Sequence, residues 1–411
     1  MLTDLALAAM FRKHVRFLML LSIGFVSQTT FAEAPKSGRL VIVGGALDPK
    51  HEAVYQSLLV TASDTEPVAI VPLASGVPEE SGPLSVQDIQ QFAKNPERVF
   101  DTKLVYTDPE KAKTQESALS LEKCGAIWFT GGDQSRIVDV MRPVTGDTVC
   151  YEAVIKVLSD GGTIGGSSAG AAMMSDPMIR SGESDTAMLL GATTELDGPG
   201  VCIGKGMGLF PYGLSDQHFL QRGRFGRLLA ALEATDNQLG FGVNEDSALV
   251  VDLNTDALTM VGDEAVVVID RKDAIREGLA RKNVRVSLLG EGDLYNPVDH
   301  KATPAAPKTK FAAKASDASA ATSFPSIWRR DSIRKMLKAL AADPTKPILS
   351  DDENFDYQFS ADEGTQFYFD PEKKSTAFTA ISVRLDITPR AGIEEKIKKA
   401  KSEYAKPTPA K

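Results

Sequence analysis

The segment Thr163-Ile-Gly-Gly-Ser-Ser168-Ala-Gly-Ala-Ala172-Met-Met174 decides the fold, because a strand, a sharp turn and a helix follow one another in it. Thr163-Ile164 is typical of a buried strand, and Ala171-Ala-Met-Met174 is compatible with a helix. The small residues of Gly166-Ser-Ser168-Ala-Gly170 between them are those that a nucleophile elbow requires. The segment predicts that Ser168 projects its hydroxyl above a sheet as a nucleophile; a plain Gly/Ser-rich turn is the alternative.

Strand-like runs alternate with longer helical stretches on the N-terminal side of this segment. The runs that predict buried strands are Leu40–Val43, Ala69–Leu73, Lys103–Tyr106 and Ala126–Phe129. Such alternation predicts an α/β fold, in which helices flank a mostly parallel central sheet and binding sites lie beyond the carboxyl ends of its strands. After about Gly240 the pattern changes to short strands that predict an antiparallel completion of this sheet. These later runs are Ala248–Asp252, Ala265–Ile269 and Val284–Leu288.

The first 32 residues have the pattern of a signal peptide. Basic residues, from Arg12 to Arg16, precede a short apolar run, and small residues surround Ala32. The apolar run is too short to span a bilayer. We therefore expect cleavage near Ala32 and a secreted or periplasmic protein that has no membrane anchor after cleavage.

Composition divides the rest of the chain into three segments. Residues 33–299 are predicted to form the catalytic domain, and residues 300–325, rich in Ala, Lys, Pro, Thr and Ser, a low-complexity linker. Residues 326–411 are predicted to form a small α+β extension, with a helix over Ile327–Ala342 and strands within Gln366–Thr388. The sequence indicates no role for this extension.

The composition excludes several classes of partner and cofactor. The formal charge of the 411 residues is −9 and the basic residues form no stripe, so we expect no nucleic-acid partner. The three cysteines, Cys124, Cys150 and Cys202, lack CxxC spacing, which favours buried thiols over a zinc site or a disulfide framework. We expect no metal and no organic cofactor.

A serine hydroxyl needs a base to remove its proton, and the chain has four histidines. His14 belongs to the signal peptide, His51 begins an early helix and His300 opens the linker. His218 lies in the dense polar segment 216–224 and is the predicted base.

An acid must orient the base, and backbone amides must stabilise the oxyanion. Glu245 is the candidate acid because residues 240–244 lead into it as a strand leads into a turn, and Asp246 remains its rival. Ala169, after the nucleophile, supplies one amide. Gly132 is predicted to supply the other, because glycine lets the backbone turn its amide toward the site.

Four blocks of the sequence, taken in order, resemble cyanophycinases, which are relatives of dipeptidase E in a serine peptidase family. The blocks are Phe129–Gln134, Gly166–Gly170 with Met174–Ile179, Asp216–Arg227, and Asn244–Ala248. The order Ser, His, Glu also differs from that of α/β-hydrolases, where the acid precedes the histidine. The resemblance implies a class I glutamine amidotransferase-like fold and a homodimer.

The resemblance further implies that the substrate is cyanophycin, a poly-aspartate chain that bears arginine on its side-chain carboxyls and is cut from one end into β-Asp-Arg dipeptides. Ser168 would be the nucleophile, His218 the general base and acid, and Glu245 the orienting carboxylate. The residues implied for the substrate site are Gln134, Asp216, Gln217, Arg222, Arg224 and Arg227. Arginine forks suit the free carboxylates of this polymer; pairing with local acids is the alternative for each arginine.

Two features depart from the compact intracellular members. The stretch between Ser168 and His218 is longer, so loop contacts there cannot be transferred from the family. The extension beyond His300 has no counterpart in them and resembles secreted cyanophycinases, which the predicted export signal also favours. One rival hypothesis is an exported dipeptidase that acts on short aspartyl peptides, and another is a non-catalytic binding protein of the same fold. A glutamine amidotransferase is disfavoured because its nucleophile would be a cysteine.

Overall fold

The computed structural model describes residues 37–62, 65–196, 198–306, 308–311, 322–372 and 378–404. The predicted signal peptide lies outside these residues. Among the described residues, no helix combines the length and the apolar character that crossing a membrane would need.

The first sheet carries the elbow segment in its centre. Its strands are β1 (Arg39–Val43), β2 (Val68–Val71), β3 (Val99–Asp101), β4 (Ala126–Phe129), β5 (Thr163–Ser167), β11 (Ser247–Asp252), β12 (Ala257–Gly262), β16 (Leu294–Asn296) and β17 (Lys301–Thr303). They lie in the order β17-β16-β12-β11-β1-β5-β4-β2-β3. The strands from β1 to β3 in this order are parallel, whereas β11, β12, β16 and β17 extend the β1 edge in antiparallel pairs. The predicted α/β class is confirmed.

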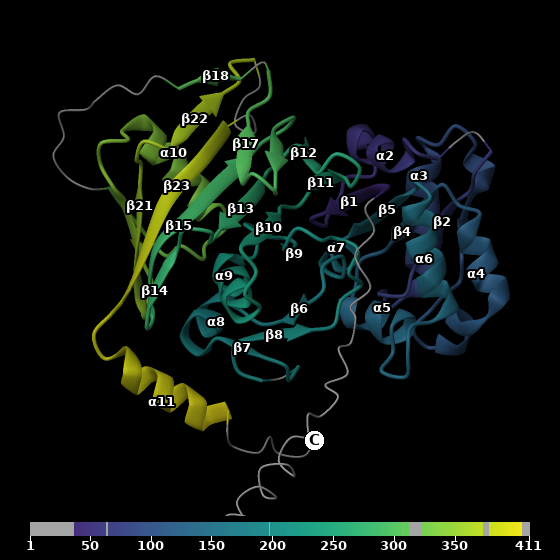
Figure 1. Cartoon of the computed structure of the whole chain (residues 1–411), viewed down its shortest axis with the longest axis horizontal. Coiled ribbons are helices and arrows are strands. Elements are labelled where there is room, and N and C mark those ends of the chain that lie inside the picture. Colours follow the sequence, from purple (N-terminus) through teal and green to yellow (C-terminus); the bar gives the residue numbers. More distant parts are fainter. Residues whose placement is uncertain are drawn as a thin grey trace, which may run out of the picture. The chain divides into compact units, whose positions relative to one another are not determined.

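Helices cover both faces of the parallel strands (Figure 1). They are α2 (Glu52–Leu59) and α3 (Pro78–Gln90) on one face, and α4 (Gln115–Glu122), α5 (Gln134–Met141) and α6 (Val149–Ser159) on the other. Because side chains alternate along a strand, Val41 and Val43 of β1 meet α2, whereas Leu40 and Ile42 belong to the opposite core. Burial on both faces explains why β2, β4 and residues Leu40–Val43 of β1 are continuously apolar.

The described residues also form a second sheet of eleven strands and a small sheet of three. The second sheet contains β9 (Leu214–Asp216), β10 (Leu239–Val243), β13 (Val266–Asp270), β14 (Ile275–Glu277), β15 (Ala280–Leu289), β18 (Thr309–Lys310), β19 (Thr322–Phe324), β20 (Ile348–Asp351), β21 (Phe355–Ser360), β22 (Gln366–Phe369) and β23 (Phe378–Pro389). The small sheet contains β6 (Met178–Ser181), β7 (Ala192–Thr193) and β8 (Val201–Gly204). The remaining helices are α7 (Ala169–Ala172), α8 (Ser184–Leu190), α9 (Phe225–Ala234), α10 (Ser332–Ala342) and α11 (Ile393–Tyr404).

Residues from the C-terminal part of the chain belong to this second sheet. Strand β23 pairs in antiparallel fashion with β15 (Figure 1). Side chains of β23 share one hydrophobic core with those of α9 and α10. The helix predicted over Ile327–Ala342 begins later, as α10 at Ser332, and its buried residues include Ile333, Met336, Leu337 and Leu340. Strands β17, β18 and β19 lie within the segment predicted as a linker.

Two strand predictions need correction. The run Lys103–Tyr106 is not a strand; β3 ends at Asp101, whose carboxylate accepts the amide of Lys103, and Lys103 has a left-handed backbone with φ of 57°. The antiparallel strands after Gly240 do not all complete the first sheet. β11 does, but β13 pairs with β10 and β15 pairs with β13, so both belong to the second sheet.

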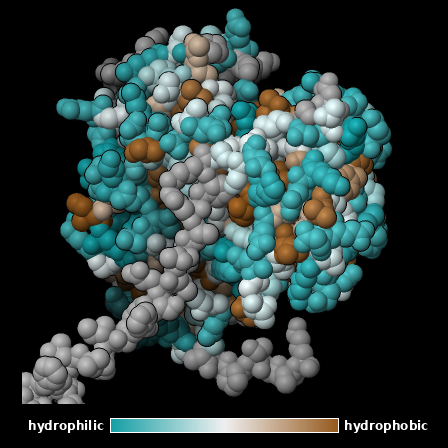
Figure 2. All heavy atoms as spheres, turned by 45° about the vertical axis from the view of Figure 1, so that its right-hand side comes forward, coloured by the Kyte–Doolittle hydropathy of each residue, from teal (hydrophilic) through white to brown (hydrophobic). Residues whose placement is uncertain are grey.

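One face of the molecule is mostly hydrophilic (Figure 2), and the three cysteines are buried. Figure 2 shows a mostly hydrophilic face on which apolar residues form separate spots. Cys124, Cys150 and Cys202 are buried, as expected for small apolar side chains. Burial raises the pKa of the Cys124 thiol to about 12, so this thiol is not an activated nucleophile.

Candidate active site

Ser168 lies at a sharp turn between β5 and α7. Its backbone is strained, with φ of 53° and ψ of −106°. Its glycine neighbours are required sterically: a Cβ at Gly166 would lie 2.4 Å from the carbonyl oxygen of Gly170, and one at Gly170 would lie 2.4 Å from that of Phe129. The turn therefore has the geometry that the sequence predicts for an elbow.

His218 and Glu245 form a hydrogen-bonded chain with Ser168. His218 Nε2 lies 2.9 Å from Ser168 Oγ, and its Nδ1 lies 2.7 Å from Glu245 Oε1. An ionised carboxylate can only accept a hydrogen bond, so Nδ1 carries the proton of the neutral ring. Nε2 is then free to accept the hydroxyl proton of Ser168.

The strand topology explains why two residues distant in sequence meet. His218 follows β9 and Glu245 follows β10, and these two strands are parallel neighbours. Their carboxyl ends therefore lie at the same edge of the second sheet. The amide of Phe219 bonds to the Val243 carbonyl, and that of Leu220 to the Asn244 side chain.

The end of β1 joins these segments to the nucleophile. The successive carbonyls of Val43, Gly44 and Gly45 accept the amides of Ser168, His218 and Asp246 at 3.0, 2.7 and 3.0 Å, respectively. Gly45 has φ of 106°, and a Cβ there would lie 2.3 Å from the His218 ring. No sequence motif indicates that the end of β1 aligns the site, although the pair Gly44-Gly45 directly follows this strand.

Asp246 does not contact His218. Its Oδ1 instead accepts the amide of Asp48 at 2.9 Å. The structure thus separates the two rival carboxylates and brings Glu245 to the histidine.

The environment of His218 favours its neutral form. Burial lowers the pKa of His218, and the positive charges of Arg222 and Arg224 lower it further, whereas Glu245 acts in the opposite direction. A neutral imidazole near physiological pH can act as a base.

The two amides predicted for the oxyanion lie at the ends of β4 and β5. Ala169 is the first residue of α7, directly after Ser168. Gly131 packs on the nucleophile, since a Cβ there would lie 3.4 Å from that of Ser168. Gly132 has φ of 141°, and a Cβ on it would lie 2.0 Å from the Ala74 carbonyl.

Asp216, Arg224 and Arg227 form a buried group beside His218. Asp216 accepts both Nε and Nη2 of Arg227, at 2.8 and 2.5 Å, and lies 3.8 Å from Nη1 of Arg224. Arg224 also donates to the carbonyl of Gln217, and burial lowers its pKa to about 10. For Arg227 and Asp216 the structure shows mutual pairing, which is the alternative to substrate binding.

The remaining predicted substrate residues differ in their exposure. Arg222 is exposed, and its charge acts on His218. Gln217 accepts a long 3.5 Å hydrogen bond from Ser168. Gln134 is buried and donates to the carbonyls of Ile179 and Arg180 at 3.0 and 2.6 Å. Arg222 is therefore open to solvent, and Gln217 contacts Ser168 directly.

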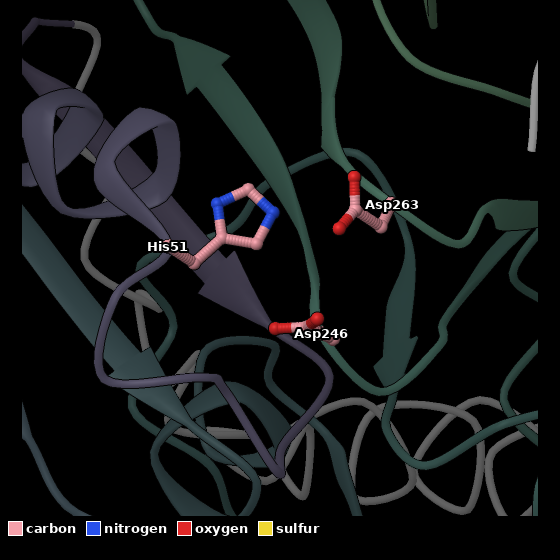
Figure 3. A group of neighbouring side chains, drawn as sticks. All are labelled: His51, Asp246 and Asp263. Carbon is pink, nitrogen blue, oxygen red and sulfur yellow. The ribbon is translucent and has the colours of Figure 1, made fainter. Parts of the chain in front are cut away.

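One group of described residues has the side-chain types that could hold a metal ion. His51, Asp246 and Asp263 offer ligand atoms that all lie within 4.8 Å of one another, and the His51 ring faces Asp263 across a gap (Figure 3). His51 Nε2 is buried without a hydrogen-bond partner among the described residues. These three residues line one cavity, and Lys50 also contributes to its lining. The sequence did not indicate this group, because its members come from three separate segments.

Known proteins match this chain over the region that carries the site. Peptidase family S51 matches residues 40–258. A cyanophycinase of Geminocystis herdmanii is 31% identical over 64% of this chain and 94% of its own length, and one of Synechococcus elongatus is 29% identical over 69% and 86%. A peptidase structure from an acI-B1 Actinobacterium is 19% identical, with a TM-score of 0.41 over 56% of this chain and 89% of that chain. The chain belongs to peptidase family S51.

Proposed function

We propose that this peptidase is a serine exopeptidase that hydrolyses cyanophycin to β-Asp-Arg dipeptides. The observation that carries the proposal is the hydrogen-bonded chain from Ser168 through His218 to Glu245. The cyanophycinases among its relatives support the substrate. The finer fold type, class I glutamine amidotransferase-like, and a homodimer belong to the same proposal.

The triad performs acyl transfer in two stages. His218 Nε2 takes the Ser168 hydroxyl proton as Oγ bonds to the scissile carbonyl carbon, and Glu245 stabilises the resulting imidazolium. The imidazolium then protonates the leaving nitrogen as the C–N bond breaks, which leaves an acyl-enzyme. A water molecule attacks the ester with His218 again as base, and Ser168 regains its proton.

Backbone amides stabilise the negative charge of each tetrahedral intermediate. The amides of Ala169 and Gly132 are the proposed donors. Because the elbow holds the Ala169 amide next to Ser168, this donor needs no rearrangement when the charge develops. The loss of one such donor typically lowers kcat about 10²- to 10³-fold.

Charged side chains on the 216–227 segment position the substrate. Arg222 is exposed and close enough to lower the pKa of His218, so its guanidinium can bind a substrate carboxylate beside the triad. Arg224 and Gln217 support this surface, and the buried Asp216–Arg227 pair holds their segment in place. Gln134 completes the proposed site at the start of α5.

We also propose that the protein is exported, through the predicted signal peptide of residues 1–32, and acts outside the cytoplasm. N-terminal sequencing of the protein recovered from the culture medium and from the periplasm tests this. A mature N-terminus near Ala32 supports it, and an intact N-terminus in the cytoplasm contradicts it.

Digestion of purified cyanophycin by the protein and by Ser168→Ala, followed by mass analysis, tests the central proposal. We expect β-Asp-Arg from the first and none from the second. Cleavage of short aspartyl peptides without cleavage of the polymer would favour the dipeptidase. A folded protein that cleaves neither substrate would favour the binding protein.

A further inference from the structure

A cavity of about 150 Å³ lies beside the nucleophile, at the carboxyl ends of β4 and β5. Gly131 and Ser167 form part of its lining, and both adjoin Ser168. Liquid water occupies about 30 Å³ per molecule, so the cavity has room for one polar side chain. A side chain near the scissile bond could therefore enter it.

Asp88, on α3, contributes a carboxylate to the wall of this cavity. Among the described residues it makes no side-chain hydrogen bond and no ion pair, and burial alone accounts for its raised pKa. Asp101, at the end of β3, differs: it pairs with Lys103 at 2.6 Å. A half-buried carboxylate without a cation is costly, and a cationic ligand would offset that cost.

A second polar group in the wall also lacks a partner. Thr130 is 3% exposed, and its Oγ1 has no hydrogen-bond partner among the described residues. Such a buried hydroxyl is normally satisfied in a folded protein. Because Thr130 directly follows β4 and lines the cavity, a ligand donor there would satisfy it.

Aromatic rings form another part of the lining. Tyr55 and Trp128 have ring centroids 6.4 Å apart and both line the cavity. Burial and the charges of Asp88, Asp48 and Asp246 raise the pKa of Tyr55, so its hydroxyl stays protonated. Aromatic faces and an acidic surround favour a flat cation.

We propose that this cavity, the Asp88 cavity, binds the guanidinium group of a substrate arginine side chain next to the scissile bond. The inference rests on the proposed function. A guanidinium has five N–H donors in a planar fork, which suits a carboxylate together with hydroxyl acceptors. The enzyme then has a cation, Arg222, for the substrate carboxylate and an anion, Asp88, for its arginine.

Paired substrates test the charge recognition. The substrates are a synthetic β-aspartyl-arginine oligomer and the same oligomer with citrulline, a neutral isostere, in place of arginine. We expect Asp88→Asn to lower kcat/KM for the arginine oligomer about 10- to 100-fold and to change the citrulline value by less than about 3-fold. Glu80→Gln, an exposed change on the same helix, serves as the matched control and should behave like the wild type.

The outcomes separate this inference from the proposed function. An Asp88→Asn enzyme that keeps the wild-type preference for arginine over citrulline would overturn the inference and leave the function intact. If the wild type cleaves neither oligomer, the proposed function fails, and a binding measurement with an arginine ligand then tests the Asp88 cavity by itself. N-acetyl-arginine amide should bind to Ser168→Ala with an affinity at least about 10-fold higher than to Ser168→Ala/Asp88→Asn. Equal affinities for the two variants would overturn the inference.

Discussion

The two large sheets contribute to the site in different ways. The first sheet provides Ser168 through a local strand–turn–helix segment in which every required residue is a near neighbour in sequence. The second sheet provides His218 at the end of β9, and Glu245 lies on the connection from β10 in the second sheet to β11 in the first. The proposed nucleophile is therefore built locally, whereas the proposed base and acid depend on how the two sheets are joined.

The second sheet also depends on the C-terminal part of the chain. Trp328 packs against the segment after His218: its carbonyl oxygen would lie 2.2 Å from a Cβ at Gly223, and its ring 2.7 Å from one at Gly226. The amide of Asp331 bonds to the Leu220 carbonyl at 3.3 Å. The half of the site that carries the base is thus supported by residues far from the chemistry.

Removal of the base should have the largest effect. His218→Ala leaves Ser168 without a proton acceptor, and we expect kcat to fall about 10³- to 10⁶-fold with the fold retained. Steady-state kinetics with a circular dichroism spectrum measures both. A loss of less than about 10-fold would show that another group activates Ser168.

Removal of the orienting charge tests the connection between the sheets. Glu245→Gln should lower kcat about 10²- to 10⁴-fold, because an amide no longer stabilises the imidazolium. Asp246→Asn is the matched control, since Asp246 contacts Asp48 rather than His218. Equal losses in the two variants would contradict the assignment of Glu245.

Displacement of His218 tests the end of β1. Gly45→Ala places a methyl group 2.3 Å from the imidazole at a φ of 106°, so we expect a loss of kcat of about 10²-fold. The position of the ring can be followed by the His218 NMR resonance. Unchanged kcat in this variant would mean that the imidazole can shift without loss of catalysis.

Removal of the Arg222 charge should affect both binding and pH dependence. Arg222→Gln should lower kcat/KM about 10- to 100-fold through the lost substrate carboxylate contact. His218 must be neutral, so activity falls as the pH drops through its pKa. Arg222 holds that pKa down, and its removal should shift the acid limb of kcat/KM to higher pH. Lys123→Gln, an exposed charge change elsewhere, should leave the limb in place.

Weakening of the C-terminal support should have the smallest catalytic effect. Trp328→Ala should destabilise the fold by about 2 to 3 kcal/mol through lost packing, and lower kcat/KM about 10-fold by loosening the segment after His218. Trp328→Phe should recover most of the activity, although it loses the hydrogen bond from Nε1 to Asp352. Lower stability with unchanged kinetics would limit Trp328 to a structural role.

Local signals in the sequence predicted a large part of the first sheet and the elbow that carries Ser168, the proposed nucleophile. The apolar runs at β1, β2 and β4 stand out because they are buried on both faces. The elbow around Ser168 is recognisable because its steric demands fall on nearby residues in the sequence. The strand prediction at Lys103–Tyr106 was wrong because local composition did not reveal where the preceding strand ends. The residues of this run are apolar enough for a strand, but the turn after Asp101 ends β3 first.

Only the tertiary structure decided the remaining features. The choice between Glu245 and Asp246, the alignment of the site by the end of β1, and the pairing of β23 with β15 all depend on contacts between residues far apart in sequence. A sequence pattern reports periodicity and local geometry, whereas such contacts depend on the packing of whole sheets. The sequence by itself thus determined the α/β class and the candidate nucleophile, and the packing of two sheets determined which groups surround it.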